Sequence, residues 1–399
     1  MAYTETQSVS WFDRLGSSFR GILAGILLVV AGTVVLWWNE GNFVATNDAL
    51  GEAQSVTQEL GNITTLDSAK SGQLVHAEGP AATKDILSDP VFGLSVNAIR
   101  LERAVEFYQW VEEARSERRQ KLGGGEEIVT TYTYSQGWTN RPVDSSQFKD
   151  PKARTENANI VLVNLDNLVV QAGNVTFGAY RLPDFLVGSI RGGVPLNAVL
   201  SDETKAALNK QLAQTAQKAG SAEMVHASGN TVYLGASPLS PHVGDARATF
   251  LQTPPGTVSI LAKLSGDTFE RYRADNGKAF SMLTMGTRGM DDMYGDAHAA
   301  NTAMTWMLRL VGAFLVVFGL RMIIAPLSVV AGVIPLLGNI VGAGAGFVSI
   351  VLGLAWALVV ISIAWLRYRP LIGVCALVVA GALIVLLHGR GRSRKAANT

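Results

Sequence analysis

Histidine and carboxylate side chains give this chain its widest range of possible chemistry. Its five histidines form no pair at the spacing that binds a metal ion from one helix. The densest cluster consists of Asp291, Asp292 and Asp296 with His298, just before an apolar segment. These groups could hold a divalent cation, but acids that face water before a membrane segment have the same pattern. We therefore expect no metal site.

A second acidic group surrounds two aromatic residues and comprises Glu102, Glu106, Glu112 and Glu113 around Tyr108 and Trp110. Carboxylates can transfer protons, but the alternation also fits a strand whose charged side chains face water. Gly123 to Gly125 is interpreted as a flexible hairpin tip rather than a phosphate cradle. The single cysteine, Cys375, lies in an apolar run, which excludes an internal disulfide. No common catalytic motif occurs, so we predict no catalytic site and no cofactor.

Long apolar runs indicate an integral membrane protein. Residues 21–38 carry no charge and end in Trp37 and Trp38, which is about the length and flank of a membrane-spanning helix. We interpret this run as a retained anchor rather than a cleaved signal peptide. Three further spans are predicted at 304–325, 345–366 and 370–387. Arg309 and Arg321 lie near the ends of the first of these, with no acid inside the membrane body.

The segment 326–344 is apolar but broken by Pro335 and several glycines. We predict that it is interfacial or re-entrant rather than a further span. Gly338, Gly342 and Gly346 recur every four residues, so on a helix they form one smooth face. Such a face allows a second helix to pack closely. We therefore expect a helix-packing or oligomer contact at these three glycines.

Charge is segregated along the chain and predicts an orientation. From Glu40 to Asp296 there are 30 acids and 23 bases, a net charge of −7, and the remainder carries 2 acids and 10 bases, a net charge of +8. Lysine and arginine favour the cytoplasmic side. We therefore place segment 1–20 and the basic tail 388–399 in the cytoplasm, and region 39–303 outside it. For a bacterial protein this means the inner membrane.

Region 39–303 is predicted to be β-rich. Thr257 to Lys263 and Thr268 to Arg273 flank a Ser265-Gly266-Asp267 turn, which is a hairpin signal. Short strands are also expected at 101–113, 128–134, 159–164, 175–180, 231–234 and 246–250. Thr204 to Ala219 is predicted to be a helix, capped by Asp202. The expected fold class is an α+β membrane protein with four transmembrane helices and a barrel-like or sandwich domain with helical inserts.

Several motifs, in order along the chain, resemble the transmembrane protein 43 family, also called LUMA. They include Asn39-Glu40-Gly41 after the first span, Gly72 to His76, Asp89-Pro90, Val105-Glu106-Phe107-Tyr108-Gln109-Trp110-Val111-Glu112, Gly244-Asp245, Arg247 and Tyr368-Arg369-Pro370. Trp138 and Leu308-Arg309 match as well. Residues 140–230 match poorly. The composition is typical of a prokaryotic member.

The resemblance implies a role in organising membrane protein complexes. Animal members lie in the endoplasmic reticulum and inner nuclear membrane and associate with emerin and lamins, partners that a bacterium lacks. The resemblance therefore implies membrane lipids, self-association and other membrane proteins as partners, and no nucleic acid. The favoured hypothesis is a non-enzymatic scaffold. The alternatives are a lipid-binding or envelope-stress sensor, an enzyme that uses His76 or the acidic cluster, and a transporter.

Overall fold

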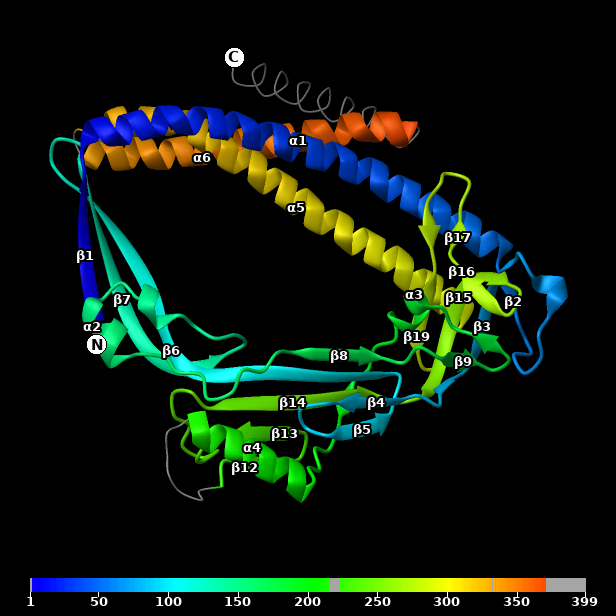
Figure 1. Cartoon of the computed structure of the whole chain (residues 1–399). Coiled ribbons are helices and arrows are strands. Elements are labelled where there is room, and N and C mark those ends of the chain that lie inside the picture. The colour runs from blue at the N-terminus through cyan, green and yellow to red at the C-terminus, as the bar shows by residue number, and fades with distance from the viewer. Residues whose placement is uncertain (1, 216–222, 332, 334, 371–399) are drawn as a thin grey trace, which may run out of the picture. The chain divides into compact units, whose positions relative to one another are not determined.

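The structure, a computed structural model, describes residues 2–215, 223–331, 333 and 335–370. The chain divides into two compact units. The β unit comprises Met1–Glu5, Ala53–Glu117 and Val129–Met293, and the membrane unit comprises Thr6–Glu52, Arg118–Ile128 and Tyr294–Thr399. Figure 1 labels their elements.

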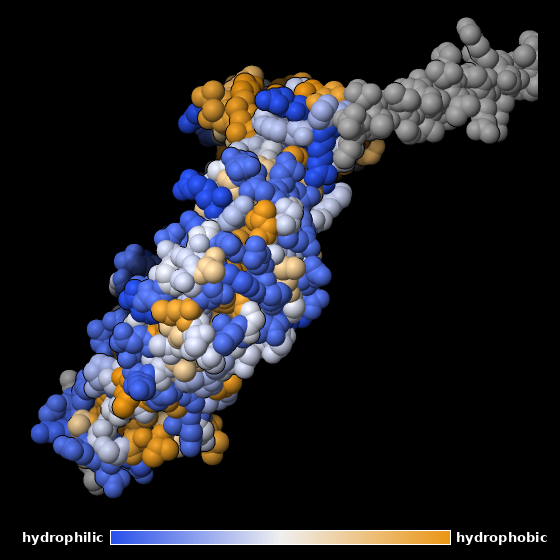
Figure 2. Space-filling view, turned by 90° about the vertical axis from the view of Figure 1, so that its right-hand side faces the viewer, coloured by the Kyte–Doolittle hydropathy of each residue, from blue (hydrophilic) through white to orange (hydrophobic). Residues whose placement is uncertain are grey.

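Three long helices dominate the membrane unit: α1 (Trp11–Val56), α5 (Met290–Ala331) and α6 (Pro335–Tyr368). Trp11–Val56, Met290–Ala331 and Ile340–Tyr368 are each long and apolar enough to cross a membrane. Hydrophobic residues gather over the helices at the top of Figure 2. The predicted fourth span, 370–387, and the basic tail lie outside the described residues, apart from Pro370. The protein is therefore an α+β membrane protein with three described apolar helices.

Helix α5 extends beyond the predicted span 304–325. It begins at Met290 and continues through Pro326 to Ala331. Proline lacks a backbone N–H and usually interrupts a helix, but the apolar residues that follow continue the helical path. Within segment 326–344, α5 ends at Ala331 and α6 begins at Pro335. The interfacial or re-entrant placement of this segment stays a prediction.

The β unit contains two large sheets and several short elements. The strands are β1 (Ala2–Val9), β2 (Gln58–Glu59), β3 (Leu74–Thr83), β4 (Ile86–Asp89), β5 (Leu94–Asn97), β6 (Arg100–Gln120), β7 (Glu126–Thr139), β8 (Leu168–Gln171), β9 (Val175–Phe177), β10 (Tyr180–Arg181), β11 (Val194–Pro195), β12 (Val225–Ser228), β13 (Thr231–Leu234), β14 (Ala246–Thr253), β15 (Gly256–Ser265), β16 (Thr268–Glu270), β17 (Tyr272–Arg273), β18 (Ala279–Phe280) and β19 (Met282–Met285). The short helices are α2 (Pro151–Glu156), α3 (Asp184–Val187) and α4 (Asp202–Thr215), with 3-10 turns at Ser68–Lys70 and Ser145–Gln147.

One sheet has the order β1-β7-β6-β14-β13-β12, with β8 beside β6 and β11 beside β14. In the other sheet the pairings form a closed circuit through β3, β9, β10, β16 and β15, because β15 also pairs with β3. The closed circuit surrounds a core that includes Val75, Ile260 and Phe177, and the open sheet packs Phe107 and Phe250 against Leu212 of α4. Burial of these apolar surfaces stabilises both sheets.

Several predicted elements are confirmed and two details were wrong. The Ser265-Gly266-Asp267 hairpin forms, with Gly266 at a φ of 61°, and residues 101–113 lie within β6. Residues 159–164 form no strand, although Leu162 and Val163 are buried. Helix α4 is capped by Ser201, whose Oγ accepts a hydrogen bond from the Thr204 backbone N–H at 3.1 Å, and Asp202 is its first residue.

Candidate functional site

Helices α1 and α5 pack in a constant antiparallel register. Gly25 faces Gly319 and Gly32 faces Gly312, and a Cβ atom added at Gly25 would lie 2.6 Å from the Gly319 carbonyl oxygen. A Cβ at Gly32 would lie 2.7 Å from the Gly312 carbonyl oxygen. The glycines therefore permit backbone-to-backbone contact of the kind that stabilises helix pairs in lipid.

This close approach yields a first prediction. Alanine at Gly312 would place its Cβ 2.6 Å from Leu36 Cγ, and such overpacking costs about 1–3 kcal/mol. Gly295 of the same helix has nothing within 4 Å of its added Cβ, so Gly295→Ala is the matched control. We expect Gly312→Ala to lower the free energy of unfolding in mixed micelles, and Gly295→Ala to leave it unchanged or raise it. Equal effects would contradict the close packing.

A buried ion pair joins the three helices where the apolar stretch of α1 ends. The Glu40 side chain is 1% exposed; its Oε1 lies 2.7 Å from Arg309 Nε and its Oε2 lies 2.8 Å from Arg309 Nη2. Trp365 of α6 donates its indole N–H to Glu40 Oε2 at 2.8 Å. The Arg309 guanidinium also lies 4.8 Å from the Trp306 ring centroid. Residues Asn39, Glu40, Thr305, Arg309 and Trp365 are called the polar lock below.

The polar lock corrects one sequence interpretation and explains a motif. Arg309 was expected to lack an acid in the membrane body, but Glu40, placed outside the predicted first span, supplies one. The buried Asn39 donates its side-chain amide to the Thr305 carbonyl oxygen at 3.1 Å. A Cβ at Gly41 would lie 2.7 Å from the Tyr368 ring. Each residue of the Asn39-Glu40-Gly41 motif thus has its own contact in the helix bundle.

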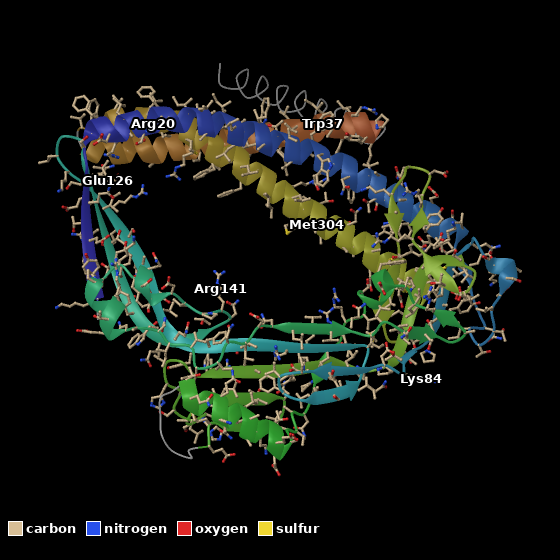
Figure 3. The ribbon with its side chains drawn as sticks, viewed as in Figure 1. Arg20, Trp37, Lys84, Glu126, Arg141 and Met304 are labelled. Carbon is tan, nitrogen blue, oxygen red and sulfur yellow. The ribbon has the colours of Figure 1, made fainter. Side chains whose placement is uncertain are left out.

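The Tyr368-Arg369-Pro370 motif ends α6 beside the same part of α1. The Tyr368 ring lies 5.9 Å from that of Trp37, and the Arg369 guanidinium lies 5.0 Å from the Phe43 ring centroid. Pro370 follows, and a residue before proline is disfavoured in a helix. Figure 3 labels Trp37 on α1 and Met304 on α5.

The glycines of α6 differ in how closely other residues pack against them. Gly353 packs closely on Val317 of α5. A Cβ at Gly342 would meet only Ser328, at 3.8 Å, and one at Gly346 would meet nothing within 4 Å. The surroundings of Gly338 lie outside what the structure describes. The predicted oligomer face is therefore uncovered at Gly346 within the described part of the chain.

In the β unit, Asp89 forms a second buried ion pair. It is 0% exposed, and its oxygens lie 2.8 and 2.7 Å from Arg103 Nη1. Asp89 Oδ1 also accepts hydrogen bonds from the Val91 and Phe92 backbone N–H groups. Arg103 donates further to the Asp166 carbonyl oxygen. These hydrogen bonds offset the free-energy cost of burying the Asp89 and Arg103 charges. The Asp89-Pro90 motif therefore holds a turn against β6.

The motif 105–112 lies on β6. Its residues 105–110 alternate between buried and partly exposed positions. Gln109 is fully buried; its amide donates to the Ile160 carbonyl oxygen and its Oε1 accepts from the Val143 N–H. Trp110 N–H donates to Asn159 Oδ1 at 2.8 Å. These polar contacts hold the segment around residue 160 beside the sheet as a loop, which explains why no strand forms there.

Glu106 and Tyr108 belong to a surface row of charged and aromatic side chains. Glu106 pairs with Arg247 at 2.7 Å, and the Arg247 guanidinium lies 4.2 Å from the Trp138 ring centroid. Tyr108 and Trp138 meet edge to face at 5.3 Å. This surface row comprises Glu106, Tyr108, Trp138 and Arg247. All four are partly exposed, so the row can contact a partner.

Gly244 and Asp245 lock the turn behind this row. Gly244 has a φ of 104°, a conformation that favours glycine. Asp245 is 2% exposed. Its Oδ2 accepts one hydrogen bond from the Tyr233 hydroxyl and another from the His242 backbone N–H. Burial and the bond to Asp245 raise the pKa of Tyr233, which keeps its hydroxyl protonated as a donor. Gly244-Asp245 therefore shapes the sheet rather than presenting a free carboxylate.

His76 is 2% exposed and is engaged at both ring nitrogens. Nδ1 lies 2.8 Å from Glu59 Oε2, and Nε2 lies 2.9 Å from the Arg288 carbonyl oxygen. Both neighbours are oxygen atoms within hydrogen-bond distance of the ring. His76 thus links β2, β3 and the segment before α5, which leaves neither nitrogen free for catalysis.

The cluster weighed above as a metal site, Asp291, Asp292, Asp296 and His298, lies at the start of α5. Across residues 2–215, 223–331, 333 and 335–370, no group of three or more His, Cys, Asp or Glu side chains could hold a metal ion. His298 Nδ1 lies 2.8 Å from Asn47 Oδ1 of α1, and Gln54 donates to Asp291. These residues form helix contacts.

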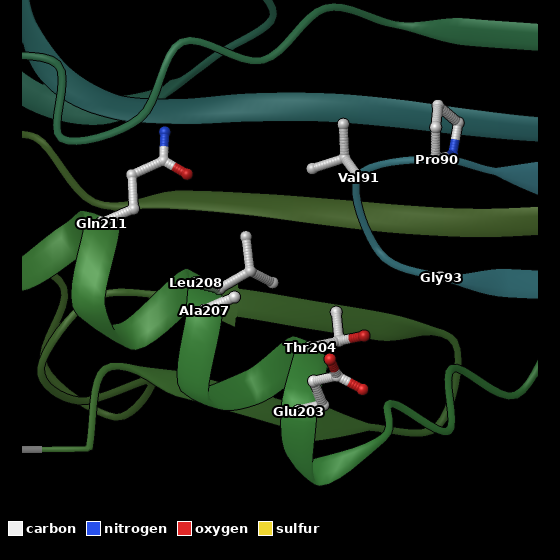
Figure 4. A pocket seen from close by; sticks show the side chains of 8 residues that line it. All are labelled: Pro90, Val91, Gly93, Glu203, Thr204, Ala207, Leu208 and Gln211. Atoms are coloured by element: carbon white, nitrogen blue, oxygen red, sulfur yellow. The ribbon is translucent and has the colours of Figure 1, made fainter.

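An open cavity of about 500 Å³ lies between the Pro90–Gly93 turn and α4. Figure 4 shows its lining, in which Glu203 is the only titratable side chain. Val91, Ala207 and Leu208 supply apolar contacts beside the polar Thr204 and Gln211. This arrangement offers no acid–base pair, and it is not the enclosed apolar cavity that a lipid-binding β domain would need.

The α1–α5 contact has a signal in the sequence, apart from the predicted glycine face of α6. Gly25 and Gly32, like Gly312 and Gly319, are seven residues apart, which places each pair on one helix face. The Glu40–Arg309 pair had no comparable signal, because the two residues are 269 positions apart.

Comparisons with known proteins agree with the family resemblance. Residues 107–370 match the family model described as Transmembrane protein 43. The chain is 24% identical to Transmembrane protein 43 of Rattus norvegicus over 399 residues, covering 98% of this chain and 94% of the relative. It is 24% identical to the Homo sapiens protein over 393 residues, covering 96% and 92%. It is 27% identical to the Drosophila melanogaster homolog over 396 residues, covering 93% and 94%. No solved structure matches.

Proposed function

Because this chain belongs to the transmembrane protein 43 family, we propose that it is a non-enzymatic membrane organiser. It self-associates through its apolar helices and presents the β unit as an interaction domain. Its motif residues stabilise helix contacts and turns, which supports an organising role over catalysis. The surface row of Glu106, Tyr108, Trp138 and Arg247 offers aromatic and charged groups of the kind enriched in protein interfaces.

The observation that carries this proposal is the part of the α6 glycine face at Gly342 and Gly346, against which no described residue packs closely. Glycines that pack within the bundle, such as Gly32 and Gly353, leave no room for a Cβ. No described residue lies within 4 Å of a Cβ added at Gly346, and one added at Gly342 meets only Ser328, at 3.8 Å. Phe347 and Ile350, which lie beside this face, are exposed. A second copy of the chain that packs here would bury these apolar groups and bring two backbones close together.

Substitution at Gly346 tests the self-association. Leucine there fills the space that a second helix needs, whereas Gly344, two residues away, also has nothing within 4 Å but faces a different direction. We expect Gly346→Leu to raise the dissociation constant about tenfold or more, the effect of losing about 1.4 kcal/mol. Gly344→Leu should change it little. Sedimentation equilibrium in density-matched detergent measures both, and a monomeric parent protein would contradict the proposal.

One contact argues against the predicted placement of region 39–303 outside the cytoplasm. Arg14 of α1 donates to the Gly124 carbonyl oxygen at the tip of the β6–β7 hairpin, and Gly123 N–H donates to the Val333 carbonyl oxygen. The strand leading to this tip carries Arg115, Glu117 and Arg118, which are costly to place in hydrocarbon. The tip contact thus favours one membrane side for the start of α1 and the β6–β7 hairpin tip, whereas lysine–arginine bias favours opposite sides.

Cysteine labelling decides between these orientations. The chain has a single cysteine, so Cys375→Ala gives a clean background for Ser8→Cys and Ser237→Cys. Labelling of the two positions from opposite sides of sealed vesicles supports the predicted orientation. Labelling from one side shows instead that α1 does not cross the membrane.

A further inference from the structure

We propose that the membrane unit holds the headgroup of an anionic phospholipid, a phosphodiester with a free hydroxyl, at one end of its helix bundle. A cavity of about 320 Å³ lies there between α1, α5, α6 and the β6–β7 hairpin tip. Its lining comprises Arg14, Gln120, Arg321, Ala325, Ser328, Gly342, Ala343 and Ala345.

The two arginines of this cavity differ in their partners. Arg14 already has an acid, because its Nε lies 3.5 Å from Glu126 Oε2, and it donates to the Gly124 carbonyl oxygen at 2.6 Å. Arg321 is exposed, and no ion pair to it occurs in the described part of the chain. A cation near the end of an apolar helix is stabilised by an anion at the membrane surface. A lipid phosphate supplies that anion in a geometry that a guanidinium binds well.

The remaining polar atoms indicate a hydroxyl on the same headgroup. Gln120 Oε1 is buried without a hydrogen-bond partner, and it is an acceptor only. The Ser328 hydroxyl donates to the Ala325 carbonyl oxygen, so its oxygen also retains acceptor capacity. A phosphoglycerol headgroup combines an anion for Arg321 with a hydroxyl donor for Gln120. A choline headgroup has neither a net negative charge nor a hydroxyl.

The surface of α5 provides a path for the acyl chains. Phe314, Phe318, Arg321, Ala325 and Ser328 follow one another at intervals of three or four residues, so they lie on one helix face. The rings of Phe314 and Phe318 stack at 5.9 Å and are 66% and 46% exposed. The cationic end of this face therefore adjoins an exposed aromatic strip, as a bound phospholipid requires. Two independent features, the unpaired arginine and the aromatic strip, indicate the same ligand.

Native mass spectrometry of the full chain in detergent tests this site with phosphatidylglycerol and phosphatidylcholine as probes. We expect the parent protein to retain phosphatidylglycerol preferentially. Arg321→Ala should weaken this retention about fivefold, the effect expected for one arginine at a membrane surface. Arg20→Ala is the matched control, since Arg20 is also exposed but does not line the cavity, and it should weaken retention less than Arg321→Ala does. Unchanged thermal unfolding of Arg321→Ala shows that the fold is intact.

Three results would overturn the assignment. Equal losses for Arg321→Ala and Arg20→Ala would indicate attraction to net charge rather than to a site. Undiminished retention in Arg321→Ala would exclude the unpaired guanidinium as the anchor. Complete displacement of phosphatidylglycerol by millimolar inorganic phosphate would assign the cavity to a free phosphate ion and not to a lipid.

Discussion

Glu40→Gln will destabilise the helix bundle by about 3–5 kcal/mol, because it leaves the Arg309 charge largely buried without its partner. Glutamine has nearly the same shape as glutamate, so the loss reports charge and hydrogen bonding rather than a cavity. The Arg309 side chain is 13% exposed, which limits rescue by water. Unfolding by sodium dodecyl sulfate in mixed micelles measures this free energy.

Asp48→Asn is the control for this prediction. Asp48 lies on the same helix but is exposed, and surface substitutions usually change stability by less than about 0.5 kcal/mol. If Glu40→Gln unfolds at the same detergent fraction as the parent protein, the polar lock contributes nothing to the bundle.

Asp89→Asn should destabilise the β unit by a similar amount, about 3–5 kcal/mol, because it leaves Arg103 buried without an acid. Arg103 is 6% exposed, so its charge cannot turn to water without opening the turn after β4. Thermal unfolding of the full chain, followed by the β-sheet circular dichroism signal, measures the loss. Glu78→Gln on β3, which changes an exposed acid, serves as the control. A transition at the parent temperature would show that the ion pair is dispensable.

The sequence was informative where local pattern determines structure. The uncharged run 21–38 identified α1, and alternation along 101–113 identified β6, because burial on one face imposes a period on the residues themselves. It was misleading at 159–164, where the β-branched residues suit a strand. There the side chains of Gln109 and Asn159 take the backbone hydrogen bonds that a neighbouring strand would have made, so tertiary contacts override propensity.

The polar lock could not be derived from local pattern. Glu40 stands just after one apolar run and Arg309 inside another, and each has an ordinary explanation as a residue near the membrane interface. Their pairing depends on the α1–α5 register, which Gly25, Gly32, Gly312 and Gly319 determine together. The resemblance marked the Asn39-Glu40-Gly41 motif, but it did not indicate the partner of each residue.

The roles of the motif residues also bear on function. Asn39, Glu40, Asp89, Gln109 and Asp245 are all buried and hydrogen-bonded. Residues of this kind stabilise the fold. A role in assembly therefore depends on the surfaces this fold leaves open, chiefly the glycine face of α6 and the surface row.

A double-mutant cycle on Glu40 and Arg309 tests directly whether one buried ion pair holds the apolar helices together. Each single variant, Glu40→Gln and Arg309→Met, removes one partner of the pair. The double variant leaves no unpaired charge, so we predict that it is more stable than the sum of the single losses implies, with a coupling of about 1.5 kcal/mol or more. Additive losses, with a coupling near zero, would contradict the polar lock.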